Sequence, residues 1–335
     1  MAGIADVAAL AGVSKATASR ALSGAGSVSE ASRRRVTDAA TALDYVPSTS
    51  AVNLATGRTQ AVGVIMPVID PWFYSHVLEG IQSELIGRGY DLTLYGAPAD
   101  SPVRARLFEE SLARRRFDGV IAVGFDADDA EIDRLGALDR PIVCVGGSHP
   151  IAGTIAVDDE DAARRGTEHL LALGHESISF LGDATSPAHR RRVQGYRNAM
   201  TDAGLADRIR LIAAAASMPG GYEAAVDALG DARQRPTALV GVCDEVAIGA
   251  ILGARLLGLG VPADLSIVGI DNHEHSEMFA LTTLEQHPRA QGRAAVELLL
   301  AHIEDPCLAA TSTLLRARLI VRNSTARNAT DRAAP

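Results

Sequence analysis

The most constraining feature of this sequence is an alternation, from residue 61 onward, of short β-branched segments with longer amphipathic segments. The short segments predict strands at 61–67, 91–96, 119–124, 142–146, 177–182, 209–213, 239–243, 266–269 and 314–321. Helical periodicity fills the intervals, for example at 76–89, 161–174, 190–204 and 245–258. Strands and helices in alternation form parallel sheets that are covered by helices on both faces. The sequence therefore predicts an α/β fold with doubly wound sheets.

The predicted strands are more than one such sheet usually holds, which indicates two subdomains. A break near 157–160 would separate them, so we expect one subdomain at about 61–157 and 287–322 and the other at about 158–286. The polar segment 323–335 is expected to be a disordered tail.

The first 46 residues have a different pattern, with three short helices and no strand. The first helix is expected at Ile4–Ala11 and ends at Gly12. Ser14 is a suitable N-cap for a second helix at 15–22, and Ser29 for a third that ends near residue 44. Residues 47–60 are predicted to be a linker, in which 51–56 could form one or two helical turns.

Charge is unevenly divided between these two parts. The whole chain of 335 residues has a formal charge of −9, but residues 1–60 carry six basic and four acidic side chains, which leaves −11 for the rest. A slightly basic head on an acidic body suggests that only the head meets phosphate. The three distant cysteines, Cys144, Cys243 and Cys307, indicate reduced thiols in a cytoplasmic protein. No apolar run is long enough to span a membrane, and no signal peptide is visible at the N-terminus.

The first two expected helices have the features of a helix-turn-helix. Ala8 is small where the helices would touch, and Gly12 permits the turn between them. The second helix would present Lys15, Ala16 and Arg20 on one side, where they could read base edges in DNA. Hydroxyl groups that could bond to backbone phosphates are those of Thr17, Ser19, Ser23 and Ser29. The alternative is an ordinary helical hairpin with solvated charges.

Enzyme signatures are absent from the sequence: it has no GxGxxG, Walker-type GxxxxGK[ST], GxSxG or HExxH motif. Asp271, His273 and His275 lie close together in one segment, but a solvated loop is the expected state of such a run rather than a metal site. We therefore expect no catalysis, no cofactor and no metal.

The segment IADVAALAGVSKATASRAL, at 4–22, resembles the head of the lactose/galactose repressor (LacI/GalR) family of bacterial transcription regulators. Further similar segments follow in the family's order, among them DPWFYSHVLEG, HLLALGHESISFLG and LGVPADLSIVGIDN. The resemblance therefore covers nearly the whole chain. It implies a homodimer whose two heads bind a pseudo-palindromic double-stranded DNA operator.

The resemblance also implies a hinge helix at 51–56, in which Ala51 and Leu54 face the DNA and the Leu54 side chain enters the minor groove. An apolar wedge of this kind opens a flexible base step and bends the duplex. The sequence departs from the family pattern at Gly3, where a Thr usually caps the first helix, and at Ser23, where an Asn is often found.

In the body, the resemblance implies two subdomains like those of periplasmic sugar-binding proteins, with a small-molecule effector in the cleft between them. The residues that it places at the cleft are Trp72, Phe73, Asp159, Asp161, Arg192, Asp244 and Asp271. Aromatic rings, carboxylates and an Arg are the groups that bind a sugar. Alternatives from the residues alone are that Trp72 and Phe73 belong to the core and that Asp244 caps a helix. Cys243 departs from the family pattern, which often has Asn there.

The sequence thus predicts a sugar-responsive, DNA-binding repressor of sugar uptake or catabolism genes, located in the cytoplasm. The alternative is a solute-binding protein without a role on DNA. Such a protein would need neither the 60-residue head nor its basic helix.

Overall fold

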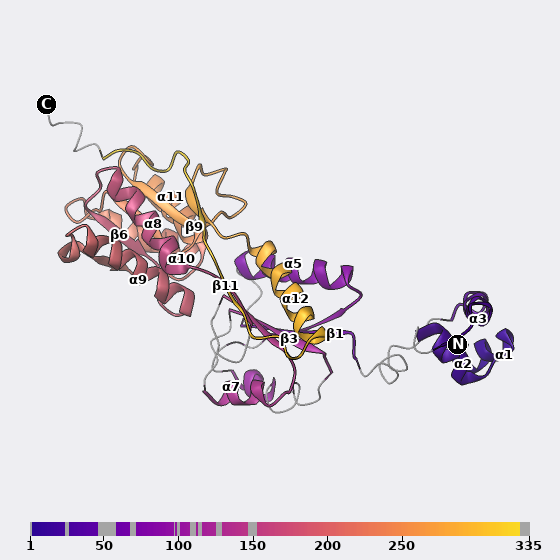
Figure 1. The fold of residues 1–335 in the computed structure, drawn as a ribbon. Helices are drawn as coiled ribbons and strands as arrows, with labels where there is room; N and C mark the ends of the chain where they lie inside the picture. The colour runs from indigo at the N-terminus through magenta and orange to yellow at the C-terminus, as the bar shows by residue number, and fades with distance from the viewer. Residues whose placement is uncertain are drawn as a thin grey trace.

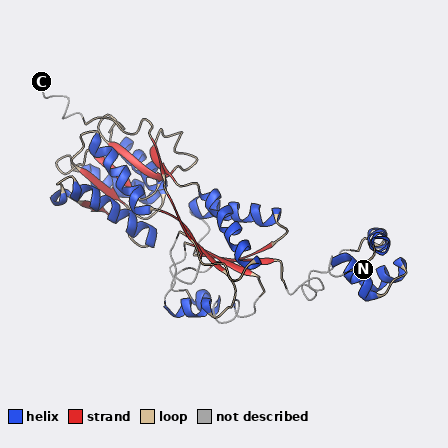
Figure 2. Cartoon of the chain, viewed as in Figure 1, coloured by secondary structure: helices blue, strands red, loops and turns tan. Residues whose placement is uncertain are grey.

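The computed structural model describes residues 2–23, 27–45, 58–67, 72–96, 98, 101–107, 112, 116–124, 129–146 and 153–328. Within these ranges the chain forms a helical head followed by two α/β subdomains (Figures 1 and 2). The predicted hinge helix, with Ala51 and Leu54, lies outside the described residues.

The head consists of α1 (Ile4–Ala11), α2 (Lys15–Ser23) and α3 (Glu30–Ala42) around a small core that includes Val7, Ala18 and Val36. Gly12 ends α1 in the left-handed region, at φ 62°. The predicted caps are confirmed because Ser14 Oγ accepts from the Thr17 N–H at 3.1 Å and Ser29 Oγ accepts from the Ser32 N–H at 3.3 Å.

The first subdomain contains a six-stranded parallel sheet in the order β11-β5-β4-β3-β1-β2. Its strands are β1 (Ala61–Met66), β2 (Asp91–Gly96), β3 (Gly119–Val123), β4 (Ile142–Val145), β5 (Gly153–Val157) and β11 (Ser312–Leu315). Val62 and Val64 of β1 pack on one face, against α5 (Trp72–Gly87) and α12 (Pro288–Glu304). Ile65 points to the opposite face, where α7 (Asp129–Gly136) lies and where the short α6 (Pro102–Arg106) precedes the buried Leu107. Side chains that alternate between two buried faces explain the continuous apolar strands.

The second subdomain contains another six-stranded sheet, in the order β12-β10-β9-β8-β6-β7. Its strands are β6 (Ile178–Leu181), β7 (Arg210–Ile212), β8 (Ala238–Gly241), β9 (Ser266–Asp271), β10 (Thr282–Glu285) and β12 (Arg318–Ile320). All neighbours are parallel except β12, which pairs antiparallel with β10. The helices are α8 (Asp159–Ala172), α9 (Pro187–Asp202), α10 (Met218–Gly230) and α11 (Asp244–Leu256), with the 3₁₀ helix η3 (Ala206–Arg208).

The structure corrects three predictions about the body. Strands β5 and β10 were not expected. The single strand expected at 314–321 is two strands, β11 and β12, which belong to different sheets. The second subdomain therefore includes residues beyond 318, which the sequence analysis assigned to the first.

The predicted disordered tail is wrong for residues 323–328, which pack on the second subdomain. Ser324 is buried, its hydroxyl accepts from the Thr282 N–H at 2.8 Å, and it donates to the Ile267 carbonyl at 2.6 Å. The Asn328 N–H donates to the Leu173 carbonyl at 2.9 Å. Polar residues fix this segment by hydrogen bonds, so its low hydrophobicity was misleading. Among the described helices, none has the length and apolar character that a membrane span requires.

Candidate functional site

A cavity of about 230 Å³ lies between the two subdomains. The first subdomain contributes Pro67, Phe73, Tyr74, Gly124, Gly146 and Gln291, and the remaining lining residues are Val157, Asp159, Thr185, Ser186, Ala188, His189, Arg192, Ala216, Cys243, Glu245, Asp271 and Gln286. Many of them follow the carboxyl end of a parallel strand, which is where open α/β sheets bind ligands. The chain passes between the sheets at 157–159, 286–288 and 315–318, so the cavity lies beside the crossovers.

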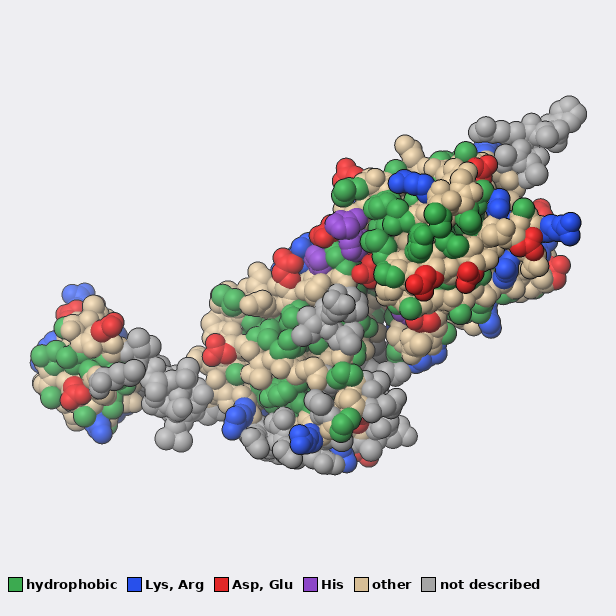
Figure 3. Space-filling model, turned by 180° about the vertical axis from the view of Figure 1, so that it is seen from behind, with side chains coloured by type: hydrophobic (Ala, Val, Ile, Leu, Met, Phe, Trp, Pro, Cys, Tyr) green, Lys and Arg blue, Asp and Glu red, His purple; other side chains and the backbone are tan. Residues whose placement is uncertain are grey.

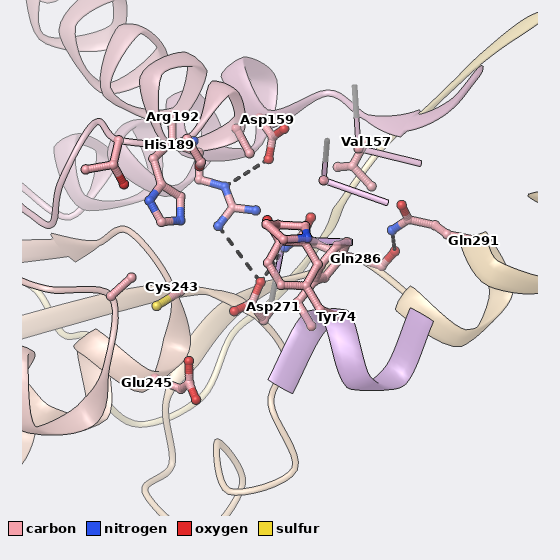
Figure 4. Close-up of a pocket in the computed structure, with 18 residues that line it drawn as sticks. Tyr74, Val157, Asp159, His189, Arg192, Cys243, Glu245, Asp271, Gln286 and Gln291 are labelled. Carbon is pink, nitrogen blue, oxygen red and sulfur yellow. Dashed lines mark hydrogen bonds and ion pairs between the residues drawn. The ribbon is translucent and has the colours of Figure 1, made fainter. Parts of the chain in front are cut away.

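Arg192 is the central charged group of the cavity (Figure 4). It lies on α9, with 5% of its surface exposed, and its Nε donates to Asp159 Oδ1 at 2.9 Å. Its Nη1 donates to the Val242 carbonyl at 2.8 Å and lies 3.9 Å from Asp271 Oδ1. Burial opposes the charge on Arg192, but the carboxylates of Asp159 and Asp271 outweigh this effect and raise its pKa. The guanidinium is therefore a fixed, charged donor.

Asp271 ends β9 and faces Arg192 from the other side (Figure 4). Its Oδ1 also accepts a hydrogen bond from Gln286 Nε2. Burial raises the pKa of Asp271 to about 8, against the opposing effect of Arg192. Near neutral pH this carboxyl can therefore hold a proton and act as a donor as well as an acceptor.

The opposite wall of the cavity is aromatic. Tyr74 on α5 lies against Gly124, where a Cβ atom would come within 2.4 Å of the Tyr74 ring. Gly124 also has φ 55°, so both space and backbone conformation require glycine there. Burial raises the pKa of Tyr74, which keeps its hydroxyl protonated opposite Arg192.

His189 and Asp183 form a second polar pair at the rim. Their Nδ1 and Oδ1 atoms are 2.7 Å apart, and this hydrogen bond is the main reason why the pKa of Asp183 falls to about 2. Cys243 is also part of the wall, and burial raises the pKa of its thiol well above the ordinary value. The thiol is thus neutral and adds an apolar surface.

Of the seven residues predicted for the cleft, four line the cavity: Phe73, Asp159, Arg192 and Asp271. The other three, Trp72, Asp161 and Asp244, are not among its lining residues. Lining residues that the sequence analysis did not name include Tyr74, Gln286 and Gln291. Tyr74 adjoins Phe73 in the sequence, but no motif singled out the two glutamines, although they flank the subdomain boundary that was expected at 286–287.

Asp244 is fully buried beneath the cavity. Its carboxylate accepts from the His273 N–H at 2.8 Å and from the hydroxyls of Ser276 and Thr283 at 2.6 Å each. All three partners belong to the second subdomain, so Asp244 holds the segment after β9 in place. Asp161 lies in the first turn of α8, where its N–H donates to Asp158 Oδ1 at 2.9 Å.

Trp72 lies at the outer edge of the junction between the subdomains. Its ring centroid is 4.3 Å from that of His76 on α5 and 5.1 Å from that of His273 in the second subdomain. His275 follows at 4.8 Å from His273, and Figure 3 shows histidine side chains side by side near this junction. The only tryptophan therefore contacts both subdomains, although it does not line the cavity.

The head presents the side chains that were predicted to read DNA. Lys15, Ala16 and Arg20 are exposed on α2, and Arg20 Nε donates to the Ala16 carbonyl at 3.1 Å. The hydroxyl of Thr17 lies 2.8 Å from that of Ser14. Ser19 is half-buried and Ser29 is exposed.

The side chain of Asp6 forms part of the cap at the start of α1, where the unusual Gly3 stands. The Gly3 N–H donates to Asp6 Oδ2 at 2.8 Å, which gives α1 one half of a capping box. A side-chain cap at this position is therefore not required for the helix to begin.

A helix-turn-helix head with an exposed basic helix, joined to two α/β subdomains around a cavity with buried charged side chains, defines a DNA-binding regulatory protein with a ligand-binding body. Residues 3–48 match the family described as bacterial regulatory proteins, lacI family, and residues 167–325 match the periplasmic binding protein-like domain. The chain is 30% identical over 329 residues to the HTH-type transcriptional regulator DegA of Bacillus subtilis (strain 168), which covers 96% of this chain and 97% of DegA. The chain belongs to the lacI family of bacterial regulatory proteins.

Solved structures agree with this assignment. The lac repressor dimer bound to operator and the anti-inducer ONPF has a TM-score of 0.87 and 28% identity, covering 97% of this chain and 99% of that one. A LacI family transcriptional regulator from Enterococcus faecium with bound ribose has a TM-score of 0.72 and 28% identity, covering 80% of this chain and 99% of that one. The predicted family and fold class are confirmed. The protein is a DNA-binding transcription regulator and not an enzyme.

Proposed function

We propose that this regulator is a homodimeric repressor whose affinity for a pseudo-palindromic operator is set by a sugar bound between the subdomains. The observation that carries the proposal is the buried cluster of Arg192, Asp159 and Asp271 in the cavity. A fixed guanidinium beside two carboxyls offers donors and acceptors at close spacing, which suits adjacent hydroxyl groups. Ribose in a related regulator supports this ligand class.

On the DNA side, the proposal assigns base reading to Lys15, Ala16 and Arg20, and backbone contacts to Thr17, Ser19 and Ser29. Ala51 and Leu54 would contact the minor groove. These assignments are supported by the exposure of the α2 side chains and by the lac repressor dimer, which is bound to operator. The regulated genes would serve sugar uptake or catabolism, and the protein would act in the cytoplasm, where its DNA lies.

The effector would act by changing the angle between the subdomains. It would contact Arg192 on one side and Phe73 or Tyr74 on the other, and so draw the two sheets together across the three crossovers. In a dimer this motion changes the distance between the two heads. A coupling of about 1–3 kcal/mol would change operator affinity by about 5- to 150-fold.

Selection of binding sites from random DNA by the full-length protein tests the operator half of the proposal. We expect two inverted half-sites, bound by two chains. Fluorescence anisotropy of the selected DNA, with and without each member of a panel of sugars, then tests the effector half. A single half-site or one bound chain would contradict the dimer, and an affinity unchanged by every sugar would contradict the effector.

A further inference from the structure

Gln291 has a buried carboxamide oxygen without a hydrogen-bond partner. The residue lies in the first turns of α12, has 0% of its surface exposed, and lines the cavity. Its Nε2 donates to the Gln286 carbonyl at 2.7 Å, whereas no donor among the described residues reaches its Oε1. Because a carbonyl can only accept, the nitrogen must face Gln286, and the free atom is therefore the oxygen.

A buried acceptor without a partner costs free energy, because it has lost its hydrogen bonds to water and no protein donor replaces them. Figure 4 shows the Gln291 carboxamide turned toward Gln286 and Val157, on the side of the cavity away from Arg192. The same figure shows Gln286 next to Asp271, whose carboxyl accepts from its Nε2. A chain of hydrogen bonds thus runs from Asp271 in the second subdomain, through Gln286 at the crossover, to Gln291 in the first.

The charged groups of the cavity further restrict the class of ligand that it can bind. Asp159 accepts hydrogen bonds from both Arg192 and Arg191, and Asp271 lies 3.9 Å from the Arg192 guanidinium, so both guanidinium groups already face carboxyl groups. His189, a further basic lining residue, pairs with Asp183. A phosphate or carboxylate would therefore meet carboxyl groups instead of a free cation. An uncharged ligand avoids this repulsion.

We propose that Gln291 is a specificity-determining residue, whose Oε1 accepts a hydrogen bond from a hydroxyl group of an uncharged sugar held by Arg192. This inference rests on the proposed effector site, and it specifies which sugars that site would bind. The hydroxyl would give this buried acceptor its hydrogen-bond partner. A sugar analogue without the hydroxyl would leave the acceptor unpaired, so it loses more affinity than it would by losing a solvent-exposed hydrogen bond. The ligand would also extend the chain of hydrogen bonds between the subdomains.

The test begins with thermal unfolding of the full-length protein in the presence of uncharged pentoses, hexoses and disaccharides and of their phosphate esters. We expect an uncharged sugar to raise Tm and its phosphate ester to have little effect. Failure of every uncharged sugar, or a preference for the esters, would overturn the proposed ligand class. The DNA selection described above is independent of this result, so it separates a wrong ligand from a wrong function.

The second step measures Kd by calorimetry for the best sugar and for each of its monodeoxy derivatives, with wild type and Gln291→Leu. We expect one deoxy derivative to bind wild type about 5- to 150-fold more weakly than the parent sugar. In Gln291→Leu that difference should disappear, because no acceptor remains for the hydroxyl. The deoxy positions that contact Arg192 should keep their effect in both proteins.

Gln194→Leu is the matched control, since Gln194 is exposed on α9 and pairs with Asn198 of its own helix. It should bind all sugars like wild type. If Gln291→Leu weakens every sugar by the same factor, Gln291 has only a structural role and the proposal is wrong. If the variant does not fold, Gln291→Met, which also lacks the acceptor and has a more flexible side chain, replaces it in the same comparison.

Discussion

Single residues determine what the cavity can bind, and their ionisation depends on burial. Asp271 and Asp159 are both buried next to Arg192, but the structure joins Asp159 to the guanidinium at 2.9 Å and leaves Asp271 at 3.9 Å. Burial raises the pKa of Asp271, and the guanidinium at this distance offsets only part of that effect. The two aspartates therefore contact the same guanidinium at different distances.

Asp271→Asn tests this difference through the pH dependence of stability. The folded pKa of Asp271, about 8, lies above the ordinary value of 3.8, so the folded chain binds a proton that the unfolded chain releases. This stabilisation is complete at low pH and is lost as pH rises from about 4 to about 8, by at most about 1.4 kcal/mol per pH unit. We expect urea unfolding of wild type to show lower stability at pH 8.5 than at pH 6. Asp271→Asn should remove most of that fall, and an identical slope in both proteins would refute the assignment.

Arg20→Ala tests base reading by α2. Arg20 is exposed and its guanidinium is available to a guanine, so we expect a loss of about 1–3 kcal/mol on the selected operator and a relaxed preference at one base pair. Arg34→Ala is the control, because Arg34 lies on α3 and pairs with the exposed Glu30. It should leave base preference unchanged in competition anisotropy. Equal base preference in Arg20→Ala and wild type would exclude Arg20 from base reading.

At the scale of elements, glycines allow helices to cross at close distance. A Cβ on Gly80 of α5 would lie 2.2 Å from the Arg289 carbonyl of α12, and one on Gly292 of α12 would lie 2.2 Å from the Val77 carbonyl of α5. The pairs α8 with α9 and α10 with α11 have the same feature, at Gly195 and Gly249. Since α12 also carries Gln291, this packing fixes one wall of the cavity.

Gly80→Ala and Gly87→Ala, both on α5, form a matched pair. The first should separate α5 from α12 and lower stability by about 1–3 kcal/mol. The second meets no atom within 4 Å and should be neutral or stabilising by about 0.5 kcal/mol, because alanine restricts the unfolded chain. Urea unfolding of the two variants measures both effects. Equal destabilisation by both would contradict the packing argument.

At the scale of the whole molecule, the two binding activities depend on different forces. The head is slightly basic on an acidic chain, so its binding to phosphate must release counterions, whereas an uncharged ligand in the cavity releases none. We expect operator affinity to fall steeply between low and moderate salt, with a slope of about −0.9 per phosphate contact in a double-logarithmic plot. Anisotropy gives the operator series. Calorimetry should show a nearly constant sugar affinity over the same salt range, and a comparable fall would contradict an uncharged ligand.

Trp72 offers a signal for motion of the whole molecule, because its ring contacts His76 in one subdomain and His273 in the other. Closure of the cleft should change its fluorescence together with ligand binding. Trp72→Phe should retain sugar affinity, since Trp72 does not line the cavity. A large loss of affinity in calorimetry would show that the residue belongs to the binding site after all.

The sequence by itself determined the features that depend on local periodicity. The turn at Gly12, the caps at Ser14 and Ser29, and most strands follow from residues that are neighbours in the chain, and these were predicted. The co-linear family motifs also indicated four lining residues: Phe73, Asp159, Arg192 and Asp271. Local patterns and family motifs can both be recognised without knowing which distant segments of the chain are in contact.

Only the tertiary structure decided which polar groups are buried together. Strands β11 and β12 belong to different sheets, and Ser324 forms hydrogen bonds with strands β9 and β10. In each case the partners are backbone groups that lie far away in the sequence. The same reason distinguishes Asp244, which makes its three hydrogen bonds within the second subdomain, from Gln291, a cavity-lining residue whose buried oxygen has no partner among the described residues. The path of the chain between the two sheets determines which distant residues meet, and local sequence patterns do not contain that information.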